Sequence, residues 1–111
     1  MAMKIFDVKY YIVSLKRKGS MGECASIDCW GEGDPPQRLY LYFMPSDTPL
    51  PANSSPIAAT GEIEGFIYQP AERYAWYLDL LRNAGPLRAR VDGDDPNRNC
   101  LMNLEMKPVG S

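Results

Sequence analysis

One stretch of the chain decides the fold: PAERYAWYLDLLRNAGP, residues 70–86. Its interior contains neither glycine nor proline before Gly85, and Pro70 suits the first turn of a helix, where a missing N–H group costs nothing. Gly85 and Pro86 supply the stop signal, so we predict a helix over Ala71–Ala84. The face that we expect to pack against a sheet holds Ala71, Tyr74, Ala75, Tyr77, Leu78 and Leu81.

Most of the remaining chain alternates in side-chain type over short segments, which is typical of β-strands. The clearest case is Arg38–Met44, where Leu and Phe side chains on one face oppose Tyr40, Tyr42 and Met44 on the other. The first segment carries apolar side chains on both faces and is therefore expected to bend or bulge. The predicted strands span roughly residues 5–16, 21–30, 38–44, 61–68, 87–91 and 100–107.

The predicted order is β-β-β-β-α-β-β, with a proline-rich loop at residues 45–58. Strands joined by short turns are expected to pair antiparallel. One helix cannot cover a face of a flat six-stranded sheet. We therefore predict an α+β fold, mostly β, in which a six-stranded antiparallel sheet curls into a small, partly closed barrel with the helix packed against it. The alternative is an open antiparallel sheet with one helix. A chain of 111 residues is expected to form a single β-rich domain over residues 1–111.

Composition and charge exclude several classes of function. Hydrophobic residues make up 45% of the chain and charged residues 23%, which is the balance of a folded globule. The net charge of −2 argues against the strong positive field on which nucleic-acid-binding proteins depend. The chain has no histidine, so His-based acid–base, nucleophilic and metal-binding designs cannot be built from it. We expect no catalytic activity, no metal and no cofactor.

The cysteines and the N-terminal sequence predict a cellular location. No basic segment followed by an apolar one opens the chain, so a signal peptide is not expected. No apolar run approaches the ~20 residues that a membrane span requires. Cys24, Cys29 and Cys100 are an odd number of cysteines, which favours free thiols in a reducing compartment. We predict a soluble, cytoplasmic protein with no membrane partner.

The predicted helix also supplies candidates for a protein interface: Arg73, Trp76, Tyr77 and Leu80. Trp76 and Leu80 fall outside the main apolar face, so Trp76 is either wrapped by the proline-rich loop or exposed. Tryptophan, tyrosine and arginine are the residue types that most often anchor protein interfaces. The leading functional prediction is a small non-catalytic module that binds a partner protein or self-associates into a homo-oligomer.

A second hypothesis is binding of single-stranded nucleic acid, as in small oligonucleotide-binding (OB-like) barrels, on stacked aromatic rings beside a basic groove. The candidate residues are Lys16, Arg17, Arg38, Tyr40, Tyr42, Arg88 and Arg90. Clustering of the basic residues around the two tyrosines would support this hypothesis. The negative net charge disfavours it, and so does a helix placed between the fourth and fifth strands, because oligonucleotide-binding barrels place theirs between the third and fourth.

A third hypothesis is a small ligand-binding protein or enzyme with a pocket under the proline-rich loop. Glu62 and Glu64 share a strand face, but such a pair is more often solvated than catalytic. Asp92, Asp94, Asp95 and Asn97 lie in one loop, where oxygen ligands for Ca²⁺ or Mg²⁺ are conceivable. Their spacing departs from an EF-hand, so a hairpin turn is the better interpretation. Cys24 and Cys29 should lie on opposite strand faces and so cannot share an ion.

Overall fold

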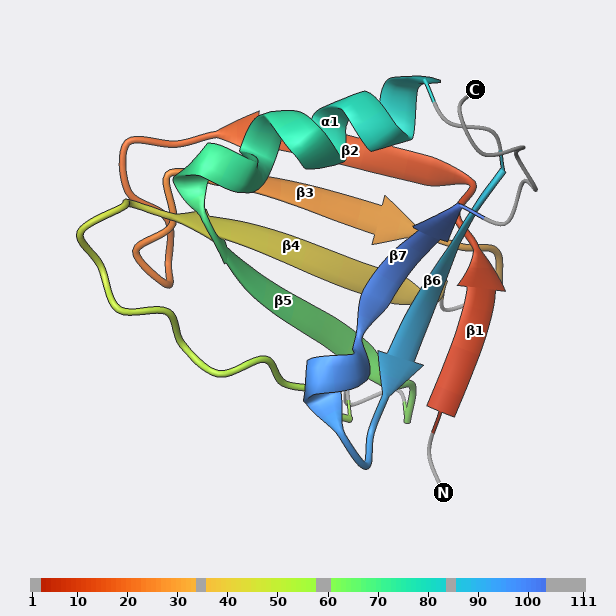
Figure 1. Cartoon of the computed structure of the whole chain (residues 1–111). Helices are drawn as coiled ribbons and strands as arrows, with labels where there is room; N and C mark the ends of the chain where they lie inside the picture. The colour runs from red at the N-terminus through yellow and green to blue at the C-terminus, as the bar shows by residue number, and fades with distance from the viewer. Residues whose placement is uncertain (1–2, 34–35, 58–60, 84–85, 104–111) are drawn as a thin grey trace, which may run out of the picture.

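The computed structural model describes residues 3–33, 36–57, 61–83 and 86–103 (Figure 1). Within them the elements are β1 (Met3–Asp7), β2 (Tyr10–Leu15), β3 (Ala25–Trp30), β4 (Arg38–Met44), β5 (Glu64–Pro70), the 3₁₀ turn η1 (Ala71–Arg73), α1 (Tyr74–Asn83), β6 (Leu87–Asp92), the 3₁₀ turn η2 (Pro96–Arg98) and β7 (Cys100–Asn103). The predicted strand at 38–44 is confirmed to the residue. Residues 104–107 of the last predicted strand, and Ala84 at the end of the predicted helix, lie outside the described residues.

The strands form two sheets (Figure 1). One has four strands in the order β2-β3-β4-β5, and the other has three in the order β1-β6-β7. All neighbours are antiparallel except β4 and β5, which run parallel. The α+β class, mostly strands with one helix, is confirmed. The predicted six-stranded antiparallel barrel is wrong, because the strands divide between two sheets and one pair is parallel.

The division starts where a single first strand was predicted. The amide of Val8 donates to the carbonyl of Leu87 in β6 at 3.0 Å, whereas the next amide, that of Lys9, donates to the carbonyl of Trp30 in β3 at 2.9 Å. Adjacent residues are therefore bonded to different sheets. The bend that the two-faced apolar pattern predicted occurs here, and it ends one sheet and begins the other.

The parallel pair follows from the proline-rich loop. The loop carries the chain from the end of β4 back along the free side of β5, where Ser54 and Phe66 exchange backbone hydrogen bonds of 2.8 and 3.2 Å. The amide of Tyr68 donates to Asn53 Oδ1 at 3.0 Å. A long return of this kind is what a parallel pair requires. The loop thus covers one edge of the four-stranded sheet.

The core lies between one face of the four-stranded sheet and a layer made of α1 and the three-stranded sheet. Its buried residues are Phe6, Ala25, Ile27, Cys29, Leu39, Leu41, Phe43, Ile63, Ile67, Ala89 and Val91. From the helix, Tyr74 and Tyr77 meet the ring of Phe43 edge-on, with centroids 5.2 and 5.6 Å apart. These contacts confirm part of the predicted apolar helix face, although Ala75 is exposed.

The two sheets pack closely against each other at Gly65 of β5. A Cβ atom there would lie 2.8 Å from Leu39 Cδ1 and 2.8 Å from Val91 Cγ2, closer than packed carbon atoms allow. Val91 belongs to β6 and is buried. The missing side chain of Gly65 is therefore what lets β6 pack onto β5.

We predict that Gly65→Ala lowers the free energy of unfolding by roughly 1–3 kcal/mol, because the added methyl forces Leu39 and Val91 apart in a filled core. Denaturant unfolding followed by circular dichroism measures the change. Ala75→Met, which adds more bulk at an exposed helix position, serves as the control and should change stability by less than about 0.5 kcal/mol. Equal stability of the Gly65→Ala variant and the wild type would contradict the close contact.

Candidate functional site

The exposed side of η1 and α1 brings the predicted interface residues together. The Arg73 guanidinium carbon lies 5.0 Å from the centre of the Trp76 ring, one helical turn away. Trp76 is 67% exposed. An open hollow of about 270 Å³ lies beside the ring and is lined by Arg73, Trp76, Tyr77, Leu80 and Leu101. We call these five residues the helix patch.

The exposure of Trp76 decides between the two interpretations that the sequence left open. The proline-rich loop, which covers this ring in one of the two interpretations, is bonded to the edge of β5 through Asn53, Ser54 and Pro56. Leu101 of β7 joins the helix patch from the three-stranded sheet. Leu101 was not among the predicted residues, because only the pairing of β7 with β6 brings it beside the helix.

The aromatic candidates of the nucleic-acid hypothesis lie on the outer face of the four-stranded sheet. The rings of Tyr40 and Phe66 stack with centroids 4.9 Å apart, and Tyr42 lies 5.8 Å from Phe66. Lys16 Nζ is 5.7 Å from the centre of the Tyr42 ring, and Arg38 Nη1 donates to the Tyr40 hydroxyl at 3.3 Å. Two of the predicted basic residues therefore do accompany the tyrosines.

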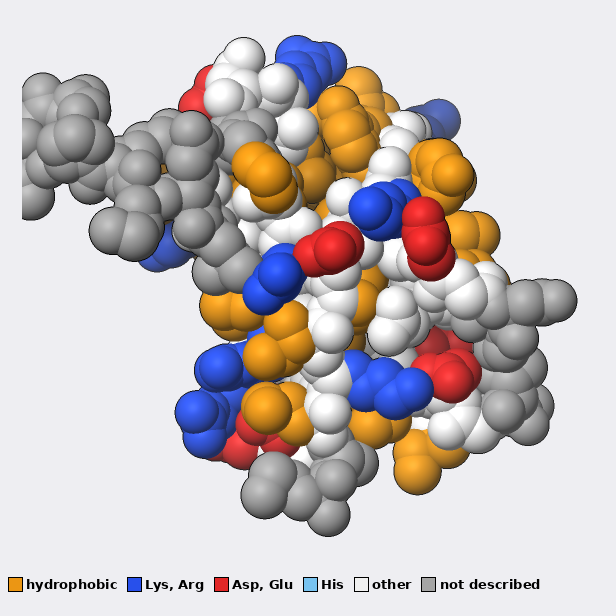
Figure 2. Space-filling model, turned by 90° about the vertical axis from the view of Figure 1, so that its right-hand side faces the viewer, with side chains coloured by type: hydrophobic (Ala, Val, Ile, Leu, Met, Phe, Trp, Pro, Cys, Tyr) orange, Lys and Arg blue, Asp and Glu red, His pale blue; other side chains and the backbone are white. Residues whose placement is uncertain are grey.

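The other arginines of that hypothesis lie elsewhere. Arg88 and Arg90 belong to β6 in the three-stranded sheet, where they alternate with the buried Leu87, Ala89 and Val91. Arg88 Nε is 2.9 Å from Asp7 Oδ1. The side of the molecule where this sheet lies shows basic, acidic and hydrophobic side chains intermixed (Figure 2). Arg17 is exposed in the turn after β2. The cluster of five basic residues around the tyrosines, which would have supported the nucleic-acid hypothesis, is therefore not formed.

Three carboxylates share the aromatic face and balance its cations. Glu23 Oε2 accepts from Lys16 Nζ at 2.9 Å, and Glu64 lies 3.7 Å from Arg38. Burial raises the pKa of Asp28, which stands beside Tyr40 in the strand register. Burial, reinforced by Asp28, also raises the pKa of Tyr42 to about 12. Glu23 and Asp28 were not among the predicted site residues, because only the pairing of β3 with β4 places Asp28 beside the rings.

Glu23 is fully buried although it is charged. Burial acts to raise its pKa, but the hydrogen bonds from Lys16 and from backbone amides outweigh that effect and hold the pKa below its ordinary value of 4.5. The amide of Met21 donates to Glu23 Oε1 at 2.9 Å. Gly19 leaves the space, because a Cβ there would overlap the carboxylate. The carboxylate thus holds the turn after β2 against the sheet.

The acidic loop between β6 and β7 is a turn built by its own carboxylates. Asp92 Oδ1 accepts from the amides of Asp94 and Asp95 at 2.9 and 3.0 Å, and Asp95 Oδ1 accepts from the amide of Asn97 at 3.2 Å. These bonds match the hairpin interpretation. Among the described residues, no group of three or more His, Cys, Asp or Glu side chains is placed to hold a metal ion.

The remaining candidates for chemistry are separated. Glu62 and Glu64 each face a different cation, since Lys4 Nζ lies 2.6 Å from Glu62. Cys29 lies in the core, whereas Cys24 is partly buried and its Sγ donates to the carbonyl of Phe43 at 3.3 Å. Burial raises the pKa of Cys29 to about 12, so this thiol is not a ready nucleophile.

No protein-family model, curated protein or solved structure matches this chain. In the described part of the chain, no helix has both the length and the apolar character to span a membrane.

We predict that Glu23→Gln lowers the free energy of unfolding at pH 7 by roughly 1–3 kcal/mol, because it removes a charge that Lys16 and buried amides solvate. The folded pKa of Glu23 is lowered, so its contribution is full above about pH 4.5 and is lost as the pH falls through the folded value. Denaturant unfolding of both proteins at pH 7 and pH 3 measures this, and the gap should narrow at pH 3.

Glu62→Gln is the matched control. The Glu62 side chain is 29% exposed and pairs with the 40% exposed side chain of Lys4, so loss of its charge should cost less than about 1 kcal/mol. Equal costs for the two substitutions, or a Glu23→Gln effect that does not change with pH, would contradict the role of the buried carboxylate.

Proposed function

We propose that this chain is a non-catalytic module that binds protein through the helix patch. The observation that carries the proposal is Trp76, whose ring is 67% exposed, stacked under Arg73 and placed at the rim of an open hollow. A folded protein gains nothing by leaving so large an apolar ring in water. Aromatic and arginine side chains are the residue types that most often contribute the binding energy at the centre of a protein interface.

The partner that best matches the helix patch is a second copy of this chain, because the patch is complementary to itself. The helix patch carries both a protruding ring and the hollow next to it, which are the two halves of a self-complementary contact. In a two-fold dimer, Trp76 of each copy would enter the hollow of the other.

The three cysteines are free thiols in the structure, which supports the reducing cytoplasm as the location of this module.

We predict that the wild type sediments as a reversible dimer at micromolar concentration, and that Trp76→Ala sediments as a monomer with a melting temperature within about 2 °C of the wild type. The mutant keeps its stability because the ring contributes little to the core. A dimer that persists in Trp76→Ala, or a mutant that unfolds, would place the ring outside any such interface. Ala75→Met, on another face of the helix, is the control and should still dimerise.

The second candidate function is binding of single-stranded nucleic acid on the aromatic face. The stack of Tyr40 and Phe66, with Lys16 and Arg38 beside it, favours this candidate. Glu23, Asp28 and Glu64 oppose it, because they offset the two cations that phosphates would need.

We predict that a fluorescent oligothymidylate shows no change in anisotropy with the protein at 20 mM salt, because the described residues of this face include three carboxylates and two cations. A salt-sensitive increase that Tyr40→Ala removes would favour the nucleic-acid function over the helix patch. Trp76→Ala, which leaves the aromatic face intact, is the control variant.

A further inference from the structure

The free edge of β2 is lined by exposed apolar side chains. β2 stands at the end of the strand order, and five of its six residues are exposed. Leu15 is 77% exposed, Tyr10 67% and Ile12 52%. Edge strands of this kind are normally short, charged or covered, because their unpaired backbone groups can pair with another chain.

The backbone of β2 offers a regular row of bonding groups. Lys16 donates its amide to the carbonyl of Cys24 at 2.8 Å, and the register pairs Ser14 with Ser26 and Ile12 with Asp28. Hydrogen-bonded pairs alternate along an antiparallel ladder, so the even-numbered residues face β3. The amides and carbonyls of Tyr11, Val13 and Leu15 therefore point away from the sheet.

The opposite edge of the same sheet, at β5, is covered by the proline-rich loop. There the proline-rich loop bonds to the backbone of Glu64 and Phe66, and Asn53 accepts from the amide of Tyr68. Of the segments that the structure describes, none pairs with the outer side of β2. Among the described residues, one edge of this sheet is therefore covered and the more apolar one is not.

Charges flank the open strand at both ends. Between Val8 and Gly22 the chain carries Lys9, Lys16, Arg17 and Lys18 and no acidic residue. Lys16 is paired with Glu23, but Lys9, Arg17 and Lys18 take part in none of the ion pairs of the described residues. The edge is thus an apolar strand with a basic cluster at its C-terminal end.

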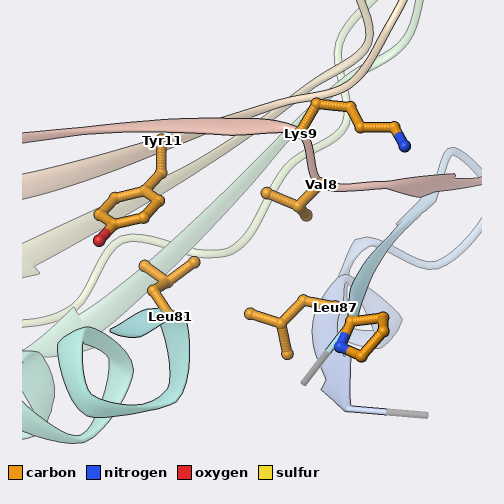
Figure 3. A pocket seen from close by; sticks show the side chains of 6 residues that line it. Val8, Lys9, Tyr11, Leu81 and Leu87 are labelled. Atoms are coloured by element: carbon orange, nitrogen blue, oxygen red, sulfur yellow. The ribbon is translucent and has the colours of Figure 1, made fainter. Parts of the chain in front are cut away.

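These charges select the occupant. Antiparallel pairing of β2 with a second copy, centred on Val13, would place Lys9 opposite Arg17 and bring like charges together at both ends. A strand whose apolar part is preceded by acidic residues would instead meet the basic cluster with its acidic end. On the inner side it would pass close to the apolar hollow of about 210 Å³ in which Tyr11 faces Leu81 (Figure 3).

We propose that the β2 edge is a second binding site, which accepts an extended segment of another protein by strand addition. The segment runs antiparallel to β2 and carries acidic residues ahead of alternating apolar ones. Its backbone pairs with Tyr11, Val13 and Leu15, and its acidic end pairs with Arg17 and Lys18. This site is separate from the helix patch and does not depend on it.

Fluorescence anisotropy with two labelled peptides tests the proposal. The probe has three glutamates followed by four valine–threonine pairs, and the control peptide has three lysines in place of the glutamates. The probe should bind saturably and at least tenfold more tightly than the control. Failure of the probe to bind, or equal binding of the two peptides, would overturn the proposal.

Three variants sharpen the test. Val13→Pro removes an outward amide without removing a bond to β3, and should weaken probe binding at least tenfold. Arg17→Glu combined with Lys18→Glu alters only exposed residues and should reverse the preference between the peptides, which keeps the test decisive even if the proline variant fails to fold. Trp76→Ala should bind the probe as the wild type does. Two results would contradict this occupant. One is probe binding that is unchanged in the charge-reversed variant. The other is a dimer of the protein that Val13→Pro dissociates and the other variants do not, because a second copy would then be what pairs with β2.

Discussion

The contact between Gly65 and Val91 is the constraint on which the rest of the structure depends. It brings β6 onto β5 at a distance that leaves no room for a side chain. The three-stranded sheet is thereby fixed over one end of the four-stranded sheet, and α1 covers the part of the same face that remains (Figure 1). Any residue with a Cβ at position 65 would force the two layers apart where the core is filled.

This arrangement determines which surfaces are left over. One helix and three short strands cover a single face of the four-stranded sheet, and the proline-rich loop covers the edge at β5. The outer aromatic face, the edge at β2 and the outward side of α1 receive no cover from the described residues. On the outer aromatic face the cations are paired with carboxylates, whereas the β2 edge and the outward side of α1 present apolar side chains to water. Both binding proposals follow from that difference.

Local patterns in the sequence were sufficient for some features and insufficient for others. The alternation in Arg38–Met44 and the stop at Gly85 and Pro86 located a strand and the helix, because both signals depend on neighbouring residues. The four interface candidates came together because helical spacing alone places Arg73 beside Trp76. The bend at Val8 and Lys9 was expected, since apolar residues occupy both faces there.

Sheet membership could not be predicted from the same patterns. No glycine or proline marks the point where the first segment changes sheets. The change occurs because the amide of Val8 bonds to β6 and the amide of Lys9 bonds to β3. The return of β5 alongside β4 depends on the path of the proline-rich loop, which composition does not reveal. Arg88 and Arg90 were grouped with Tyr40 because the division of the strands between two sheets could not be predicted. Their alternation was read correctly, but they belong to the other sheet.

None of the described residues covers the β2 edge, and hydrogen exchange of the β2 backbone amides in dilute protein tests this most directly. The structure predicts slow exchange at Ile12 and Ser14, whose amides face β3, and fast exchange at Tyr11, Val13 and Leu15. Protection of all five amides in the monomer would mean that another part of the chain covers this edge, and would contradict the account.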